Sequence, residues 1–241
     1  MIDIHSHFLP SIDDGAADVD ESLKMLRDSY DQGVKIIVAT PHCVIRNEDD
    51  IDRFLEKRSK SYEALLDGQK KTGIQIPKIL LGAEVCFDND LNSYKNIGKL
   101  CIEGTGAMLT ELTTTAMPTD KLSECIFELN MRRIRPVIAH IDRYREWRRI
   151  LDTFAGLYVS YQINANRFFA RRDRKFIKNF KNIYGSCIIS SDMHNTEDRK
   201  SRMLAAYEKA KKMFGSDADD MFGLEAERVL GIKYAEFLSA R

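Results

Sequence analysis

The chain has 241 residues, with 37 lysines and arginines balanced by 37 aspartates and glutamates. A formal net charge of zero predicts neither a nucleic-acid partner nor attraction to a membrane surface, and no apolar stretch approaches the length of a membrane span. The five cysteines, an odd number without a Cys-x-x-Cys pair, argue against a disulfide framework or a zinc ribbon and fit a reducing cytoplasm.

Short β-branched runs alternate with amphipathic segments along the chain. The first run starts at residue 2 without a preceding basic region, so we expect a strand there and not a signal peptide. The predicted strands cover residues 2–5, 35–39, 79–84, 107–111, 136–140, 157–163 and 186–191. The predicted helices cover residues 19–30, 50–71, 119–131, 171–182 and 198–214. The acidic stretch from Asp217 to Asp220 is expected to be a solvated loop.

This alternation predicts the fold class. Strands that alternate with helices pair in parallel and give an α/β protein. Seven such units suggest a closed or nearly closed barrel, and barrels of this length are usually one domain. We therefore expect residues 1–241 to form a single domain.

All five histidines stand at or just after these strand candidates. His5 and His7 follow the first run, His42 follows the second, His140 closes the fifth and His194 follows the seventh. In parallel α/β barrels, catalytic residues collect at the carboxyl ends of the strands. Histidines in these places indicate a metal site.

Carboxylates accompany the histidines. His5 and His7 are two residues apart on a strand, so their side chains project from the same face, where two imidazoles suit a divalent transition ion. Asp192 and His194 repeat this spacing after the last predicted strand, which is next to the first in a closed barrel. Five imidazoles and four carboxylates exceed the needs of one ion and indicate a multinuclear cluster. Glu84 and Glu111 close apolar runs, where burial of a carboxylate would be costly without a partner or a cation, and Asp14 follows the first predicted strand.

Taken singly, these residues have ordinary structural explanations. A histidine after Thr-Pro could cap a helix, a lone glutamate could be a rim charge, and Asp-Asp-Gly is typical of a turn. Their joint occurrence at successive strand ends favours the metal site. Two arginines, Arg143 and Arg199, lie shortly downstream of histidines. Alone they would be surface charges, but beside a metal cluster each guanidinium is predicted to bind phosphate through two donors.

Motifs between residues 1 and 200 resemble those of the polymerase-and-histidinol-phosphatase (PHP) superfamily. Within it they are similar to the bacterial manganese-dependent protein-tyrosine phosphatases of capsule and exopolysaccharide operons. The matching motifs occur in chain order and none is missing. They are Met1-Ile2-Asp3-Ile4-His5-Ser6-His7, Asp13-Asp14-Gly15, Thr40-Pro41-His42, Gly82-Ala83-Glu84, Ala139-His140-Ile141-Asp142-Arg143-Tyr144 and Ser191-Asp192-Met193-His194-Asn195.

The resemblance implies an α/β fold that is a distorted (β/α)7 barrel of the PHP type with three metal ions. Manganese is the metal that the resemblance favours, and the mixed nitrogen and oxygen ligands also suit iron or zinc. The implied ligands are His5, His7, Glu84 and Asp192 for the first ion, Glu84 as a bridge with Glu111 and His140 for the second, and Asp14, His42 and His194 for the third.

The resemblance also implies a substrate and a compartment. The substrate would be a tyrosine-phosphorylated protein, namely a bacterial tyrosine kinase of polysaccharide export, in the cytoplasm, with no nucleic acid and no stable membrane insertion. Three stretches depart from the family pattern. Asp142 replaces a common glutamate, residues 43–50 are more acidic than in many relatives, and residues 166–175 match the pattern weakly.

The last of these stretches has a basic cluster interleaved with two phenylalanines. Beside the barrel mouth it would attract an acidic, phosphorylated tail. An ordinary solvated helix start explains the same residues equally well. The cluster consists of Arg167, Arg171, Arg172, Arg174 and Lys175.

We therefore expect phosphomonoester hydrolysis by a hydroxide that bridges two ions, with Arg143 and Arg199 as the catalytic residues that bind the phosphoryl oxygens. A phosphocysteine mechanism is excluded, because none of the cysteines is followed by an arginine six residues later. Three alternatives have the same donor residues or the same fold. One is a PHP-type small-molecule phosphatase, such as a histidinol-phosphatase-like enzyme. Another is a metal-dependent amidohydrolase, although no predicted strand ends in its usual bridging lysine. The third is a non-catalytic regulatory domain, which would be expected to have lost ligands.

Overall fold

The structure is a computed structural model that describes residues 1–87, 91–113 and 119–232. Its strands pair in parallel throughout these residues. Helices cover the strands, so that β2, for example, is buried at every position and is apolar along its whole length. The parallel α/β architecture predicted from the sequence is thus confirmed. The strands are β1 (Ile2–Asp3), β2 (Ile36–Ala39), β3 (His42–Cys43), β4 (Lys78–Leu81), β5 (Glu84–Phe87), β6 (Ala107–Leu112), β7 (Arg135–Ile138), β8 (Ser160–Asn164) and β9 (Ile188–Ser190).

The described strands form two sheets, in the orders β1-β2-β4 and β3-β5-β6-β7-β8-β9. The chain passes from the first sheet to the second twice. Pro41 separates β2 from β3, since proline lacks the amide hydrogen that a ladder needs. Gly82 and Ala83 separate β4 from β5, where a single strand over residues 79–84 was predicted. Glu84 therefore begins a strand and does not end one, which corrects the sequence-based placement.

The chain segments that follow β1 and β9 lie side by side. Ser6 forms an isolated parallel bridge with Met193. The amide of Asp192 donates to the carbonyl of His5, and the amide of His7 donates to the carbonyl of Met193, both at 2.9 Å. These bonds bring the start of the chain to its last strand.

Local sequence signals explain where the longer helices begin and end. The Asp18 side chain accepts from the Glu21 amide at the start of α1, and Asn47 with Asp50 forms a capping box at the start of α2. Gly73 ends α2 in the left-handed region, at φ 65°. The helices are α1 (Val19–Asp31), α2 (Glu48–Thr72), α3 (Thr119–Met131), α4 (Trp147–Thr153), α5 (Arg171–Tyr184), α6 (Met203–Phe214), α7 (Asp217–Asp219) and α8 (Glu225–Leu230). Shorter turns are η1 (Leu91–Ser93), η2 (Ile97–Leu100), η3 (Ile141–Arg143), η4 (Ala165–Phe168) and the π-helical η5 (Asp220–Leu224).

The carboxyl-terminal third differs most from the prediction. Residues 217–220, expected to be a solvated loop, are the helix α7 and the start of η5. Ala218, Met221 and Phe222 are buried there, so an apolar side fixes the segment against the core. The helix predicted from residue 198 begins only at Met203, the strand predicted from residue 157 begins at Ser160, and the short helices α4 and α8 were not predicted.

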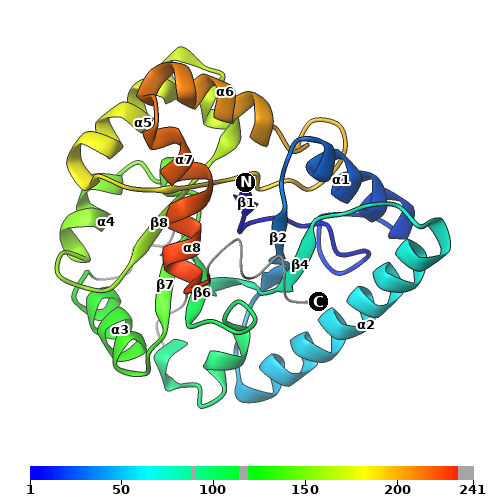
Figure 1. Cartoon of the computed structure of the whole chain (residues 1–241). Helices are drawn as coiled ribbons and strands as arrows, with labels where there is room; N and C mark the ends of the chain where they lie inside the picture. Colours follow the sequence, from blue (N-terminus) through cyan, green and yellow to red (C-terminus); the bar gives the residue numbers. More distant parts are fainter. Residues whose placement is uncertain (88–90, 114–118, 233–241) are drawn as a thin grey trace.

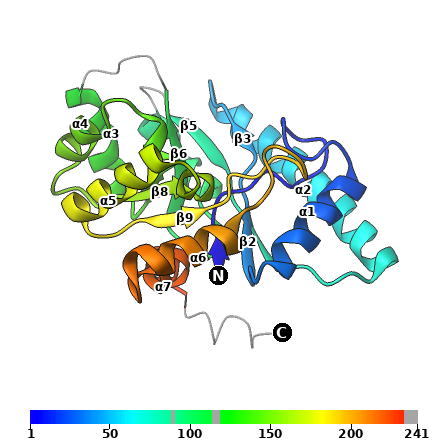
Figure 2. The ribbon, with the colours of Figure 1, turned by 90° about the horizontal axis from the view of Figure 1, so that it is seen from above.

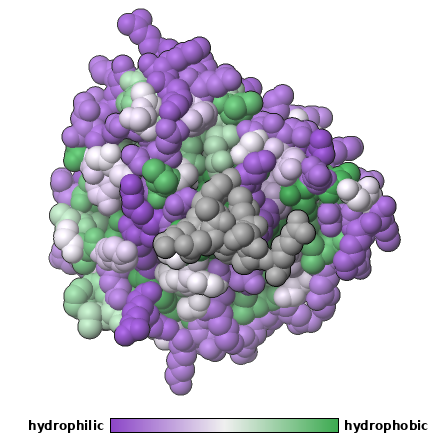
Figure 3. Space-filling view, in the orientation of Figure 1, coloured by the Kyte–Doolittle hydropathy of each residue, from purple (hydrophilic) through white to green (hydrophobic). Residues whose placement is uncertain are grey.

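Helices α1 to α6 lie around the outside of the strands (Figure 1). Figure 2 shows β3 on one side of the molecule, while α7 and the amino terminus lie on the opposite side. The face that carries α8 is mostly hydrophilic, with small scattered hydrophobic areas (Figure 3). Within the described residues, every helix is too short or too polar to cross a membrane. The polar residues described next follow β1, β7 and β9, begin β3 and β5, or lie near the end of β6.

Candidate metal centre

The five histidines come together in space. The ring centroids of His7 and His194 are 3.9 Å apart, those of His7 and His42 are 4.5 Å apart, and those of His5 and His140 are 5.7 Å apart. His42 is half-exposed, whereas the other four side chains are buried. The parallel strands end at the same edge of the fold, which is why residues separated by up to 189 positions meet here.

Glu84 lies at the middle of this group and is 1% exposed. Its Oε2 atom is 3.3 Å from Nε2 of His5, 3.3 Å from Nε2 of His7 and 3.0 Å from Nδ1 of His42. Its Oε1 atom is 3.0 Å from Nε2 of His140. Among the described residues, Oε2 nevertheless has no partner with hydrogen-bond geometry. A carboxylate oxygen that faces three imidazoles in this way has the surroundings of a metal ligand.

His5 and His7 turn the same ring nitrogen toward each other, with their Nε2 atoms 3.1 Å apart. Each ring has an acceptor at its other nitrogen. Asp13 Oδ2 is 2.8 Å from Nδ1 of His7, and Gln162 Oε1 is 3.1 Å from Nδ1 of His5. When both rings are neutral and these acceptors take the Nδ1 hydrogens, the two Nε2 atoms present lone pairs to the same point. Such an arrangement fits a shared cation.

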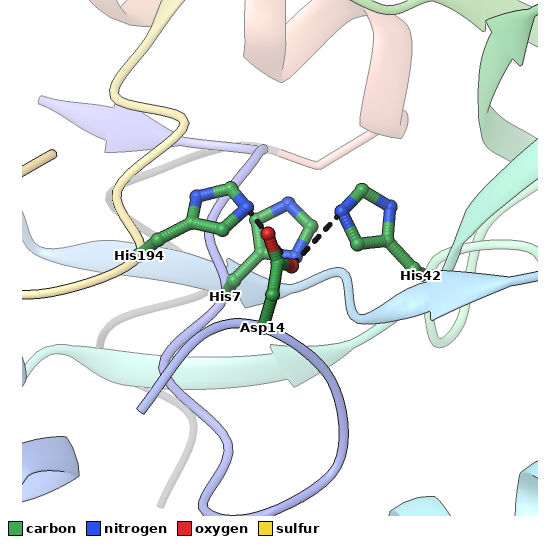
Figure 4. A group of neighbouring side chains, drawn as sticks. All are labelled: His7, Asp14, His42 and His194. Carbon is green, nitrogen blue, oxygen red and sulfur yellow. Dashed lines mark ion pairs between the residues drawn. The ribbon is translucent and has the colours of Figure 1, made fainter. Parts of the chain in front are cut away.

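Asp14 lies in a second group of donor residues within the centre. Its Oδ1 atom is 3.2 Å from Nε2 of His42 and 3.4 Å from Nε2 of His194 (Figure 4). With His7, these residues offer four donor atoms that all lie within 4.8 Å of one another. Gly15 permits the close turn, because a Cβ atom at that position would lie 1.9 Å from the carbonyl oxygen of His7.

The carboxylates of Glu84 and Glu111 make the third part. Nε2 of His140 lies 3.0 Å from Glu84 and 3.3 Å from Oε1 of Glu111. A group of donor atoms within 4.8 Å also unites Glu84 and Glu111 with His42.

The structure thus brings all nine predicted ligand residues into one connected cluster. The geometric groups overlap with the sequence-based sets but are not identical to them. His7 falls into two groups, and His42 lies near Glu84 as well as near Asp14. The predicted first set adds Asp192, whose Oδ1 is 3.4 Å from Nε2 of His5.

Three residues that sequence analysis did not single out hold the donors in place. Asp13 also accepts from the amide of His42 at 3.0 Å, and Gln162 accepts from the amide of His140 at 2.6 Å. The side-chain Nδ2 of Asn164 donates to Oδ2 of Asp192 at 2.7 Å. Hydrogen bonds of this kind orient ligands around metals. The alternation of Gln162 and Asn164 on β8, which repeats the His-x-His spacing, was the signal that could have revealed these two residues.

Two of the four described non-glycine residues with positive φ belong to this cluster. His140 has φ 33° and Asp192 has φ 53°, both in the left-handed region that disfavours residues with a Cβ atom. Such conformations persist where the surrounding structure holds them and occur preferentially at functional sites. Here they follow β7 and β9 and turn both side chains into the cluster.

Arg143 and Arg199 lie at the rim of the cluster. Arg143 pairs with Asp192, and Arg199 lies 3.3 Å from Oδ2 of Asp14 and 3.6 Å from Oδ1 of Asp192. Both guanidinium groups are partly exposed, so they combine contact with the centre and access to an arriving anion. Their placement suits phosphate binding next to the donor cluster.

Charge pairing within the cluster sets its protonation. Burial lowers the pKa of His5, but the carboxylates of Glu84 and Asp192 outweigh it and raise the pKa to about 9. Burial raises the pKa of Glu84, but the surrounding histidines hold it well below its usual value. Burial and the charge of His7 lower the pKa of His194 to about 4. Anionic carboxylates next to these imidazoles form a donor set that attracts a divalent cation.

The cysteine thiols lack the properties of a nucleophile. Burial raises the pKa of Cys43 and Cys187 to about 12 and that of Cys101 to about 11. A nucleophilic cysteine requires a lowered pKa and access to solvent. These cysteines are therefore structural.

Comparison with known proteins shows the family of this chain. The family model described as "Capsular polysaccharide synthesis, CpsB/CapC" matches residues 1–231. Tyrosine-protein phosphatase CpsB of Streptococcus pneumoniae is 29% identical over 232 residues, which cover 90% of this chain and 92% of the relative. Tyrosine-protein phosphatase YwqE of Bacillus subtilis is 28% identical over 242 residues, which cover 95% of this chain and 91% of the relative.

Solved structures agree with the sequence comparison. Crystal structures of YwqE from Bacillus subtilis and CpsB from Streptococcus pneumoniae, described as unique metal-dependent tyrosine phosphatases, match with a TM-score of 0.76 and 26% identity, over 96% of this chain and 94% of the other. A β-aspartyl dipeptidase from Fervidobacterium islandicum matches with a TM-score of 0.58 and 13% identity, over 96% of this chain and 74% of the other. That second likeness concerns the fold alone.

Proposed function

The chain belongs to the CpsB/CapC family of capsular polysaccharide synthesis, and on this premise we propose that it is a metal-dependent protein-tyrosine phosphatase of capsule or exopolysaccharide synthesis. The observation that carries the proposal is the convergence of the His5 and His7 Nε2 atoms on Glu84 Oε2, with two arginines at the rim. The converging donor atoms would bind a cation, and the two arginines would bind a phosphoryl group.

The donor set fits a trinuclear centre. His5, His7, Glu84 and Asp192 would hold one ion. Glu84, Glu111 and His140 would hold a second, and Asp14, His42 and His194 a third. Mn²⁺ is the metal of this proposal, with iron or zinc as substitutes for the same mixed ligands. The metals would supply Lewis-acid catalysis and a water whose pKa is lowered toward neutrality.

The protein's own groups bind and orient the phosphate ester. Arg143 and Arg199 donate hydrogen bonds to phosphoryl oxygens, whose charge grows or redistributes in the transition state. The tyrosine leaving group, with a pKa of about 10, needs less protonation than an alkoxide would. Asp13, Gln162 and Asn164 keep the donors oriented through hydrogen bonds, so that little reorganisation is needed during the reaction.

The proposal extends to the barrel topology, the protein substrate, the cellular compartment and the domain organisation. The bridge between Ser6 and Met193 supports a distorted (β/α)7 barrel closed between its first and last strands. The protein substrate would be a tyrosine kinase of polysaccharide export, met in the cytoplasm. Residues 1–241 would form one phosphatase domain.

Side-by-side kinetics test this function. The chain, loaded with Mn²⁺, is given a phosphotyrosine peptide or histidinol phosphate, and kcat/KM is measured for each. The proposal requires the peptide to be hydrolysed with the higher kcat/KM. A preference for histidinol phosphate would instead favour a PHP-type small-molecule phosphatase, and the absence of hydrolysis of both would contradict phosphatase activity.

A further inference from the structure

A cavity of about 360 Å³ opens beside the candidate metal centre. It lies between the segment that follows β7 and the first residues of α5, and its volume falls in the range of roughly 300–1,000 Å³ that holds small organic ligands. Arg143 lines it and also pairs with Asp192 of the metal centre, so the cavity adjoins the place where the phosphoryl group would be bound. The side chains that matter here are Arg143, Arg145, Arg167, Arg172, Trp147 and Phe176.

The lining is positively charged. Four guanidinium groups and the two carboxylates of Asp142 and Asp173 line it, so the net charge of the lining is +2. Arg167 pairs with both carboxylates, and Asp142 is buried, so this arginine forms a fixed floor. Arg145 and Arg172 are exposed, and among the described residues neither lies within 4 Å of a carboxylate oxygen. Two guanidinium groups are therefore available to an anion.

The cavity also has an aromatic wall. The rings of Trp147 and Phe176 meet edge to face, with centroids 5.2 Å apart. Trp147 is 8% exposed, which fixes its ring in the wall. An aryl phosphate has an anionic part and an aromatic part. Guanidinium groups bind the anion, and aromatic rings pack against the aryl group.

We propose that this cavity is a second subsite that binds a further phosphotyrosine side chain of the same substrate, next to the one being hydrolysed. The inference rests on the proposed function, and it adds that the enzyme prefers substrates phosphorylated at neighbouring tyrosines. It also gives different roles to the arginines of the basic cluster at residues 167–175. Arg172 binds the ligand, Arg167 is held by Asp142 and Asp173, and Arg174 donates to the carbonyls of Phe168 and Phe169.

Trp147 allows binding to be measured without turnover. It is the single tryptophan of the chain, so its fluorescence reports on this cavity. The probe is the amide of phosphonomethyl-phenylalanine, a phosphotyrosine analogue that is not hydrolysed, and inorganic phosphate serves as the comparison. A saturable change is expected with the analogue in the wild type and in R171A/K178A, a control that removes two exposed charges of α5 outside the cavity. The change should disappear in R145A/R172A. An equal response to inorganic phosphate, or an unchanged response in R145A/R172A, would overturn the assignment.

Kinetics with three peptides connect the subsite to specificity. Each peptide has one phosphotyrosine, and its second position is phenylalanine, glutamate or phosphonomethyl-phenylalanine. We expect the phosphonate to lower KM roughly tenfold relative to phenylalanine, since partly exposed charge pairs contribute modestly. In R145A/R172A this difference should vanish, while kcat and the hydrolysis of a small aryl phosphate stay unchanged.

The outcomes separate the two proposals. Equal KM values for all three peptides, with normal turnover, would contradict the subsite and leave the phosphatase intact. A glutamate peptide as good as the phosphonate peptide would overturn the phosphotyrosine assignment in favour of a general site for acidic side chains. Failure of the metal-loaded protein to hydrolyse any of the peptides would contradict the proposed function itself.

Discussion

The Nε2 atoms of His5 and His7 face each other at 3.1 Å, on the same face of the segment that follows β1. Two nitrogen lone pairs at this distance repel unless a cation lies between them or one ring is protonated. The arrangement is maintained from behind, by Gln162 at Nδ1 of His5 and by Asp13 at Nδ1 of His7. The candidate metal centre would therefore depend on residues that need not touch the metal.

The first prediction concerns Asp13. In Asp13→Asn the amide can present a hydrogen to Nδ1 of His7, which weakens the preference for the tautomer that directs a lone pair inward. We expect Mn²⁺ affinity to fall roughly 10- to 100-fold, as is typical when an orienting partner of a ligand is lost. Isothermal titration calorimetry measures this, with Asp20→Asn on the exposed side of α1 as the matched control. Equal affinities in both variants would show that Asp13 does not orient the ligand.

The second prediction separates phosphate binding from metal binding. Arg143→Ala and Arg199→Ala should each lower kcat/KM by about 2–4 kcal/mol of transition-state stabilisation, the usual effect of removing one such donor. Metal content should stay at the wild-type level, because a guanidinium group is a donor and not a ligand. Arg149→Ala, which removes an exposed arginine paired with Glu146, is the control. Loss of metal from either rim variant would contradict the division of roles.

The third prediction concerns the thiols. With pKa values raised to about 12, Cys43 and Cys187 should resist alkylation by iodoacetamide at pH 8, and the treated protein should keep its phosphatase activity. Mass spectrometry of the treated protein counts the modified cysteines. Prior unfolding provides the positive control, since it exposes all five. Rapid inactivation together with modification of a buried cysteine would point to a thiol in the mechanism.

The fourth prediction is a pH dependence. Without added metal, a His5 whose pKa is raised from 6.5 to about 9 contributes stability that is fully present below pH 6.5 and is lost as the pH rises through 9. A metal ion competes with this proton, so metal binding strengthens over the same interval. We expect the increase in Tm caused by Mn²⁺ to grow from pH 6.5 to pH 9. Differential scanning fluorimetry with and without Mn²⁺ measures it, and an increase that shrinks over this range would contradict the proton–metal competition.

Features that follow from a regular spacing of residues could be predicted from the sequence. The strand alternation gave the parallel architecture, and the spacing of His5 and His7 placed both rings on one face of the chain. Gln162, which holds the His5 ring, and Asn164, which holds Asp192, were missed, because both are uncharged and their role exists only once β8 stands beside β7 and β9.

Interruptions and tertiary packing were harder to predict. Gly82 and Ala83 stand within an apolar run, so the sequence offered no clear sign that the strand breaks and changes sheets there. The acidic residues around Ala218 suggested a loop, whereas burial of Ala218, Met221 and Phe222 against the core makes the segment helical. Local composition was overruled in both cases by contacts distant in sequence.

We propose above that Glu84 would hold metal ions whose presence is required for phosphotyrosine hydrolysis. The measurement that tests it most directly is the recovery of activity during Mn²⁺ titration of the chelated protein, with bound metal counted by elemental analysis. We predict that activity on a phosphotyrosine peptide returns in step with bound Mn²⁺ in the wild type. Glu84→Gln should retain less metal and remain slower by several orders of magnitude, because a neutral amide cannot bridge two cations in the same way. Full activity in the chelated protein, or full metal occupancy with near-native turnover in Glu84→Gln, would contradict the account.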